Sequence, residues 1–344
     1  MLTKWYTYLK DDEKETCEDP KMFSKSRSKT VDKQKGKYIS FPDVIQSQED
    51  PDTYFLVYRE GDRHHPSWSN LVLQKSTNRG STWKVKKRFR SNFSSEGRVW
   101  NCPRFAYINN ELVIICDTKT STREATCEWK TYIMEDLDSM YSSKRLIAFP
   151  GMLPDRVVPF KGNLFCANHR HMIHNGRWLI QLINWSRDNG RTWYDSNILA
   201  VGEDQKFCEA SVVNIEDKYL LAYLRDNSGH IKNIYTTTSK DGVKWTKPKP
   251  LKKIWGQRPT ANYVDGKVYC AYRDTNTCGI GIFEHDLDSN ETRSFVVDKE
   301  YRDNQYHCGY TGLAPMGNGE FLVAYYIKKT SYSPHIKTAK LTLK

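Results

Sequence analysis

Polar residues that could do chemistry stand at the start of short apolar stretches, far apart along the 344-residue chain. Glu209 opens CEASVV and Tyr310 opens CGYTGL, and Asp43, Arg104 and Arg258 hold comparable places. A purely structural strand does not need such side chains, so we interpret these residues as the mouth of a functional pocket. The alternative is ordinary polarity at the rim of a sheet.

Three arginines close apolar stretches: Arg59 in VYR, Arg225 in YLR and Arg273 in AYR. Guanidinium groups that end strands on one face can hold a carboxylate through paired hydrogen bonds. The pattern therefore favours a substrate that carries an acidic group. The alternative is that each arginine covers a tyrosine ring on the surface.

The stretches that must position these residues repeat along the chain. An apolar run that follows a turn occurs six times, and it often ends in Tyr or Arg. Gly, Asn and Asp turns separate the runs and no long stretch has helical periodicity, which is typical of strands and hairpins. We predict an all-β fold, a six-bladed β-propeller over residues 38–344, from the runs at 53–59, 110–117, 176–183, 218–225, 266–273 and 319–326.

A second motif repeats with a matching period. STNRGSTW (76–83), SRDNGRTW (186–193) and the shorter SKDGVKW (239–245) resemble Asp-boxes. Their glycine supplies a positive φ, the Asn or Asp side chain accepts backbone hydrogen bonds, and the tryptophan packs between blades. We therefore predict hairpin turns between the two outer strands of a blade, with a structural role and no chemistry.

The chain is basic, with 53 Lys and Arg against 41 Asp and Glu and a net charge of +12. This charge permits nucleic acid, an anionic sugar, an acidic polymer or a membrane surface as a partner, and it equally fits a solvated surface. No nucleic-acid-binding motif is present, so we expect no nucleic-acid partner.

Residues 1–37 are charged and poor in aliphatic side chains, and we interpret them as an extension outside the propeller. They show no secretory signal, and no apolar run in the chain is long enough to span a membrane. This favours a cytoplasmic or virion-associated protein.

The nine cysteines are widely spaced and form no C-x-x-C pair, which argues against structural zinc. Cys116 and Cys270 lie in apolar runs and are expected to be buried thiols. The histidines of HRHMIH (169–174) sit on a strand that approaches a turn. We expect neither a metal nor a cofactor.

The propeller repeats, the Asp-boxes and the polar strand openings together resemble the sialidases, or neuraminidases, and the wider group of Asp-box glycoside hydrolases. The resemblance covers roughly residues 38–344. It implies a tyrosine nucleophile, a glutamate that activates it, an aspartate as acid/base, and three arginines that hold the sugar carboxylate. CEASVVNIEDKYLLAYLRDN resembles the glutamate strand and its following arginine, Glu209 and Arg225, and GYTGLAPMGNGEFLVAYY resembles the tyrosine strand with Tyr310. Arg258 or Arg273 would supply a further arginine.

These roles agree with the chemistry of the residues. A tyrosine has a pKa of about 10 and is a weak nucleophile at neutral pH unless a base such as a glutamate takes its proton. A neutral nucleophile avoids repulsion at an anomeric carbon that bears a carboxylate. Sialidases, with their tyrosine nucleophile, are an exception to the usual two-carboxylate arrangement of glycosidases.

The first blade departs from the family pattern. Ile39-Ser40-Phe41-Pro42 stands where the family has Arg-Ile-Pro, so the first arginine of the clamp is missing. Either Arg59 or Arg104 compensates, or the substrate lacks the carboxylate.

The acid/base is expected in the loop REGDRHHPSWSN (59–70), where the family keeps its aspartate. Asp62 is the first candidate, with Asp43, His64 and His65 behind it. Two adjacent histidines beside Asp62 can bind an anionic sugar or act as a general acid.

The expected function is therefore a retaining, sialidase-like exo-glycosidase that cleaves a terminal acidic sugar from a glycan or glycoconjugate. Two alternatives remain open. One is a non-catalytic carbohydrate-binding or protein-binding propeller, because a fold does not fix a function. The other is a polysaccharide lyase that acts on uronic acids through a tyrosine and a histidine.

Overall fold

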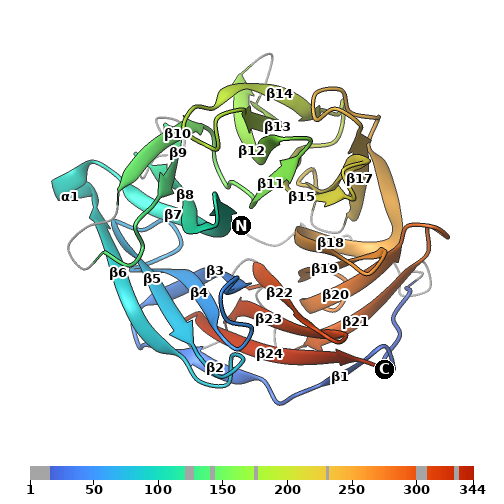
Figure 1. Cartoon of the computed structure of the whole chain (residues 1–344), viewed down its shortest axis with the longest axis horizontal. Helices are drawn as coiled ribbons and strands as arrows, with labels where there is room; N and C mark the ends of the chain where they lie inside the picture. Colours follow the sequence, from blue (N-terminus) through green and yellow to red (C-terminus); the bar gives the residue numbers. More distant parts are fainter. Residues whose placement is uncertain are drawn as a thin grey trace, which may run out of the picture.

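The structure, a computed structural model, describes residues 16–120, 128–139, 144–173, 177–229, 232–299, 308–328 and 333–344. Within these ranges nearly all regular structure is β-strand, and the helix α1 is a single turn at Phe93–Glu96. Antiparallel sheets lie around a common centre, with one edge of each sheet inward and the other at the rim (Figure 1). The predicted all-β, propeller-like architecture is confirmed.

Consecutive strands pair in chain order, so each sheet is a meander. The first sheet holds β3 (Tyr38–Gln46), β4 (Tyr54–Gly61), β5 (Trp68–Ser76) and β6 (Lys84–Asn92). The second holds β7 (Val99–Ile108), β8 (Glu111–Lys119), β9 (Trp129–Met134) and β10 (Arg145–Pro150). The third holds β11 (Val157–Phe160), β12 (Asn163–Ile173), β13 (Arg177–Ser186) and β14 (Tyr194–Ala200).

The number of separate blades differs from the prediction of six. The described strands form five hydrogen-bonded sheets, because β18 (Lys249–Val264) is 16 residues long and belongs to two predicted units. Its first part pairs with β17 and its second part with β19. A seven-stranded sheet results, made of β15 (Phe207–Ile215), β16 (Tyr219–Asp226), β17 (Asn233–Ser239), β18, β19 (Lys267–Asp274), β20 (Gly279–Asp286) and β21 (Thr292–Asp298).

The last sheet joins the two ends of the described chain. β22 (Thr311–Gly317), β23 (Glu320–Ile327) and β24 (His335–Leu343) pair in order, and β24 also pairs with β1 (Phe23–Lys25) and β2 (Lys29–Asp32). Phe23 lies opposite Leu343, and Lys29 opposite Thr338. From Phe23 onward, the expected extension therefore supplies strands to the last sheet.

The apolar core lies between neighbouring sheets. Val57 and Leu71 of the first sheet pack with Phe105 and Ile114 of the second, and similar clusters join the other neighbours. Because the inner strands are covered on both faces, their sequences read as continuous apolar runs. Cys116 and Cys270 are buried in these clusters as expected, and Cys127 lies outside the described residues.

The Asp-boxes form the predicted turns. They connect β5 with β6, β13 with β14, and β17 with β18. In the second box, the backbone N–H of Thr192 donates to Asp188 at 2.8 Å, and Gly190 has a φ of 81°. Trp193 packs against Phe149 of the neighbouring sheet with ring centroids 5.2 Å apart. The boxes thus fix the turns and help to join adjacent sheets.

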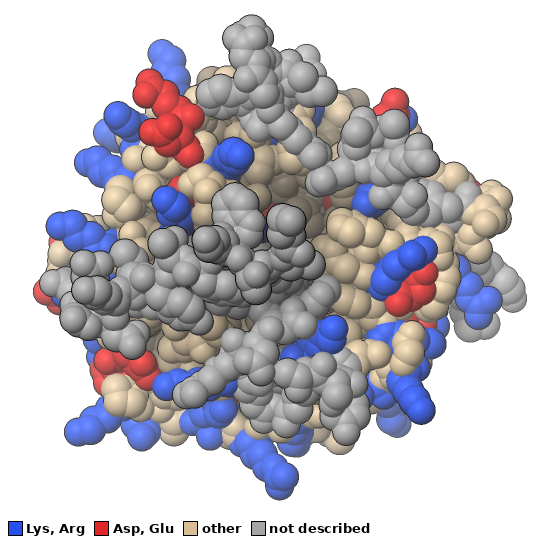
Figure 2. Space-filling view, turned by 180° about the vertical axis from the view of Figure 1, so that it is seen from behind, with Lys and Arg blue, Asp and Glu red and all other residues tan. Residues whose placement is uncertain are grey.

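Positive charge is dispersed over the described part of the face that Figure 2 draws. On the face drawn in Figure 2, Lys and Arg are spread around the periphery with Asp and Glu between them. This agrees with a solvated basic surface. Among the described residues, no helix has the length and apolar character needed to cross a membrane.

Candidate active site

The same kind of β-bulge recurs at the polar residues that open the innermost strands. The pairing register shifts between Ser40 and Asp43 in β3, between Cys208 and Ser211 in β15, and in the same way in β7 and β18. Phe41, Glu209 and Arg258, each one residue into a bulge, have φ values of 57°, 51° and 50°. A bulge redirects a side chain out of the regular alternation of a strand. The innermost strands therefore present these residues differently from their apolar neighbours.

The three strand-closing arginines occupy one structural position. Arg59 pairs with Ser40, Arg225 with Cys208 and Arg273 with Gln257, each opposite the residue just before a bulge. Their recurrence in the sequence thus corresponds to a recurrence in space. Their surroundings nevertheless differ, and of the three only Arg59 is among the residues that line the same pocket as Glu209 and Tyr310.

Glu209 and Tyr310 come together, although 101 positions separate them in the chain. The Tyr310 hydroxyl donates a short hydrogen bond to Glu209 Oε1. Arg225 Nη1 donates to Glu209 Oε2 at 2.8 Å and lies 3.4 Å from the Tyr310 hydroxyl oxygen. Gly309 has a φ of 91°, and a Cβ there would lie 2.6 Å from Arg273 Cβ, so glycine allows the chain to enter the site beside that arginine.

The charges around this trio set the resting protonation state of Glu209 and Tyr310. Burial alone would raise the pKa of Glu209, but the charges of Arg225 and Arg258 and the hydrogen bond from Tyr310 lower it to about 2. Burial and the neighbouring Glu209 charge raise the pKa of Tyr310 well above its usual value, against the opposing effect of Arg225 and Arg273. At neutral pH the pair is thus a neutral phenol bonded to a carboxylate.

A pocket of about 180 Å³ opens onto this pair and has a mixed lining. Its polar wall includes Lys119, His169 and Asn101, which the sequence analysis did not single out as site residues. Asn101 is the first residue of the β7 bulge, the place that Glu209 holds in β15, and this equivalence could have identified it. Lys119 ends β8 one position after Thr118, which holds the place of the strand-closing arginines. The apolar part comes from Phe41, Pro66, Trp129, Met152, Leu153 and Leu179.

His169 is a buried member of this wall. Its Nδ1 accepts a hydrogen bond from the backbone N–H of Glu209 at 3.4 Å. Burial lowers the pKa of His169 to about 3, against the opposing effect of the Glu209 charge. The ring is therefore neutral at physiological pH, and it supports the backbone that carries Glu209.

In the loop after β4, the predicted acid/base Asp62 forms hydrogen bonds within the loop, whereas two neighbouring histidines line the pocket. Both oxygens of Asp62 accept hydrogen bonds from Ser67, one from the backbone N–H at 2.9 Å and one from the hydroxyl at 2.8 Å. Asp62 is not among the pocket-lining residues, whereas His64 and His65 are. Lys119 Nζ lies 3.0 Å from His65 Nδ1, and His64 Nδ1 lies 3.3 Å from His65 Nε2. Asp62 thus braces the loop that presents the two histidines.

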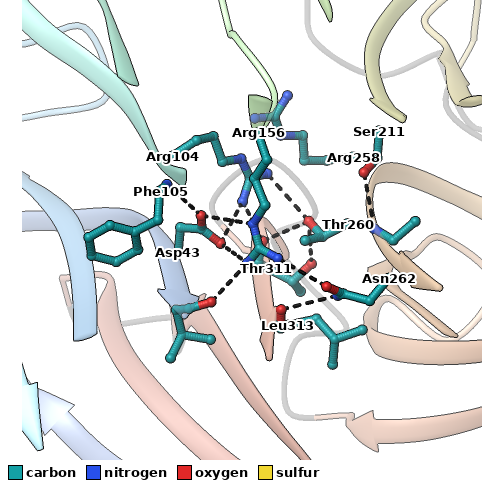
Figure 3. Close-up of polar contacts among 12 residues, drawn as sticks. Asp43, Arg104, Phe105, Arg156, Ser211, Arg258, Thr260, Asn262, Thr311 and Leu313 are labelled. Atoms are coloured by element: carbon teal, nitrogen blue, oxygen red, sulfur yellow. Dashed lines mark hydrogen bonds and ion pairs between the residues drawn. The ribbon is translucent and has the colours of Figure 1, made fainter. Parts of the chain in front are cut away.

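Asp43 and Arg104 belong to a separate buried cluster near the centre of the molecule (Figure 3). Arg156 binds both carboxylate oxygens of Asp43, with Nε 3.1 Å from Oδ2 and Nη2 2.5 Å from Oδ1. Arg104 Nη1 lies 3.4 Å from Asp43 Oδ1 and donates to the Thr311 carbonyl at 2.9 Å. Neither Asp43 nor Arg104 lines the pocket, so these two predicted substrate contacts are placed elsewhere.

Arg59, on β4, is one of the two arginines considered in place of the arginine that the first blade lacks. Arg59 lines the pocket, and its Cζ lies 4.5 Å from the Phe41 ring centroid. Its Nη1 donates to Asn101 Oδ1 and its Nη2 to the His64 carbonyl, both at 3.0 Å. Of the two arginines considered for this role, the structure places Arg59 on the pocket wall and Arg104 outside it.

Within the described ranges, no group of three or more His, Cys, Asp or Glu residues has a geometry that could hold a metal ion. His174 of the histidine-rich stretch lies outside those ranges.

Comparisons with known proteins place this geometry in context. Residues 137–277, which contain two of the Asp-boxes, match the model of a BNR repeat-like domain. No curated protein matches the sequence.

Three solved structures illustrate the similarity in fold. A protein of unknown function from Dyadobacter fermentans superimposes with a TM-score of 0.79 at 18% identity, covering 94% of this chain and 100% of that one. Trypanosoma rangeli sialidase gives a TM-score of 0.65 at 12% identity, covering 92% of this chain but only 59% of the sialidase. The endosialidase of phage phi92 gives 0.67 at 8% identity, covering 94% and 70%. At these identities the likeness concerns the fold.

Proposed function

Taking the chain as a BNR-type protein of the sialidase superfamily, we propose that it is a retaining glycoside hydrolase that cleaves a terminal acidic sugar. Tyr310 is the nucleophile and Glu209 is the base that takes its proton. The observation that carries the proposal is the buried hydrogen bond from the Tyr310 hydroxyl to Glu209, on the wall of a pocket. A buried tyrosine needs such a partner to become nucleophilic at neutral pH.

The charge of the pocket supports an anionic substrate. Glu209 is the acidic residue among those that line the pocket, and its carboxylate is already hydrogen-bonded to Arg225 and Tyr310. The basic side chains that line the pocket are those of Arg59 and Lys119, together with the histidines of the loop after β4. A sugar carboxylate is drawn to this basic wall, which uses Arg59 in place of the arginine that the first blade lacks.

The acid that protonates the leaving oxygen is assigned to the His64–His65 pair instead of Asp62. Asp62 is committed to Ser67, and those hydrogen bonds lower the pKa of its carboxyl group although partial burial acts to raise it. A general acid must hold a proton at neutral pH, which a carboxyl with a lowered pKa does not. Histidine has an ordinary pKa near neutrality and suits this task.

The proposal is tested with a panel of fluorogenic glycosides of acidic sugars, including sialic acids and uronic acids. Wild type is expected to release the fluorophore from at least one of them, and Tyr310→Phe is expected to lose turnover by about 1,000-fold or more while it melts normally. Turnover by Tyr310→Phe at the wild-type rate would remove Tyr310 from the mechanism. If wild type hydrolyses no member of the panel, the enzyme proposal fails.

A second candidate is a carbohydrate-binding propeller without catalysis. It is favoured by one observation: Asp62, at the place of the family's acid/base, faces Ser67 and does not line the pocket. Calorimetric titration of the same acidic sugars distinguishes the two functions. Binding without hydrolysis supports the binding function, and release of an unsaturated product would instead indicate a lyase.

A further inference from the structure

Two arginines lie against the ring of Tyr310. The guanidinium carbon of Arg258 is 5.3 Å from the ring centroid, and that of Arg273 is 5.2 Å from it. Both belong to the seven-stranded sheet, Arg258 on β18 and Arg273 on β19. Neither residue is among those that line the pocket, so their contact is with the tyrosine and not with the space a substrate would occupy.

The bonds of these arginines do not neutralise their charge. Arg273 donates from Nε to the Cys308 carbonyl at 2.7 Å and from Nη1 to Gln257 Oε1 at 2.8 Å. Arg258 is fully buried and donates to the Pro154 carbonyl at 3.4 Å, while its Nε and Nη1 have no hydrogen-bond partner. Among the described residues, neither guanidinium has a carboxylate within ion-pair distance.

A buried cation that forms no ion pair at contact distance is unfavourable, and this cost falls when a negative charge develops directly against it. When Glu209 takes the proton of Tyr310, the negative charge moves from the carboxylate to the phenolate. Arg225 faces the place where the charge begins, because it binds Glu209. Arg258 and Arg273 face the ring over which the charge then spreads. A cation over an aromatic face is attracted to its π-electrons, and a phenolate offers a stronger attraction than a neutral phenol.

We propose that Arg258 and Arg273 are positioning residues that stabilise the phenolate of Tyr310, instead of members of the carboxylate clamp. The proposal rests on the proposed function and assigns the two arginines to one step of it. In that step the Tyr310 O–H bond breaks and its proton passes to Glu209 Oε1. The phenolate oxygen bonds to the anomeric carbon as the glycosidic bond breaks, and the leaving oxygen takes a proton from the acid in the loop after β4.

The first test separates chemistry from binding by measuring kcat and KM on a glycoside that wild type hydrolyses. Arg258→Gln is expected to lower kcat by about 10- to 100-fold with KM within about threefold, and Arg258→Lys, which keeps the charge, is expected to retain more of kcat. A rise in KM with an unchanged kcat would show that Arg258 binds the substrate and would overturn the proposal.

The second test needs no glycosidase activity. An arylsulfonyl fluoride reacts with a phenolate to form a sulfonate ester and release fluoride, and mass spectrometry locates the ester. Labelling of Tyr310 is expected in wild type, with a rate at least about tenfold lower in Arg258→Gln, and no label at position 310 in Tyr310→Phe.

The matched control is Arg104→Gln, which removes another buried arginine that does not contact the Tyr310 ring. It is expected to lower the melting temperature but to leave the labelling rate of Tyr310 unchanged. Equal labelling in wild type and Arg258→Gln, or no labelling of Tyr310 in wild type, overturns the proposal. An inactive wild type that still shows the contrast in labelling would refute the hydrolase function and leave the electrostatic effect on Tyr310 standing.

Discussion

Two buried clusters of charge are built from the same kind of strand opening, and they differ in how the charges are paired. In the central cluster, Asp43 is held by Arg156 and Arg104, and Arg104 also donates to the Thr311 carbonyl and the Thr260 hydroxyl (Figure 3). In the pocket cluster, Glu209 is shared between Arg225 and a neutral tyrosine hydroxyl. The central cluster lies away from the pocket, whereas Glu209 and Tyr310 line it.

Buried charge is therefore by itself a poor guide to function in this fold. A carboxylate fully occupied by two guanidinium groups is a structural tie between sheets, since removing either partner leaves a buried charge uncompensated. A carboxylate bonded to a titratable hydroxyl at a pocket wall can exchange a proton. Substitutions in the central cluster should therefore lower stability more than turnover, and substitutions in the pocket cluster should lower turnover more than stability.

The largest effect is expected for Asp43→Asn. The substitution leaves Arg156 and Arg104 without their anionic partner, so the free energy of unfolding should fall by about 3–5 kcal/mol. Urea unfolding followed by circular dichroism measures this loss. Turnover per folded molecule should remain near wild type, and a selective loss of turnover in a stable variant would place Asp43 in the active site after all.

Glu209→Gln should instead lower turnover strongly and stability little. The amide keeps the size of the side chain and an acceptor for Arg225, but it cannot take the Tyr310 proton. Turnover is expected to fall by about 100- to 1,000-fold while affinity for the acidic sugar stays within a few-fold of wild type. Steady-state kinetics combined with calorimetric titration checks both values, and turnover that persists would remove Glu209 as the base.

The pocket should also make the protein sensitive to acid through His169. Its pKa is about 3 when folded, well below the ordinary 6.5, so below pH 6.5 the unfolded chain binds a proton that the folded chain does not. Stability should therefore fall as the pH drops from about 6.5 towards 3, by roughly 2 kcal/mol between pH 6.5 and 4.5 from this group. Unfolding of wild type and His169→Gln across this range is the measurement, and the variant should show a flatter dependence.

The smallest effect is expected for Asp62→Asn at the pocket edge. Loss of the charged acceptor for Ser67 should cost about 1–2 kcal/mol of stability and change turnover only a few-fold. His65→Gln in the same loop should slow an unactivated glycoside much more than one with a good leaving group, which needs less help from an acid. A loss of about 100-fold in Asp62→Asn, with His65→Gln unaffected, would return the acid/base role to Asp62.

Prediction from sequence succeeded where local patterns carry the information. The Asp-box turns follow from Ser, Gly and Trp at fixed spacing, and the continuous apolar runs correspond to strands covered on both faces. The prediction of six separate blades was wrong because β18 passes from one predicted unit to the next without a break. Gly256 and Pro259 nevertheless mark the change of partner within that strand. Pairing with β17 ends at Trp255, pairing with β19 begins at Gly256, and Pro259 lies in the bulge of the second ladder.

The residues of the site, too, could be predicted from the sequence only in part. The residue types, the recurrence of strand-closing arginines and the resemblance to sialidases were sufficient to select Glu209, Tyr310 and Arg225, which lie within hydrogen-bonding distance of one another. They were not sufficient to separate Arg59 from Arg104, or to show that Asp62 turns to Ser67.

The strands, the turns and the chemical types of residue at the inner ends of the sheets can be predicted from the sequence, because they depend on local periodicity and backbone preference. Which charges pair, and which of them face a pocket, is decided only in the folded chain. That decision depends on contacts across 100 or more residues, such as Tyr310 with Glu209 and Arg156 with Asp43, and on bulges that redirect side chains by one position.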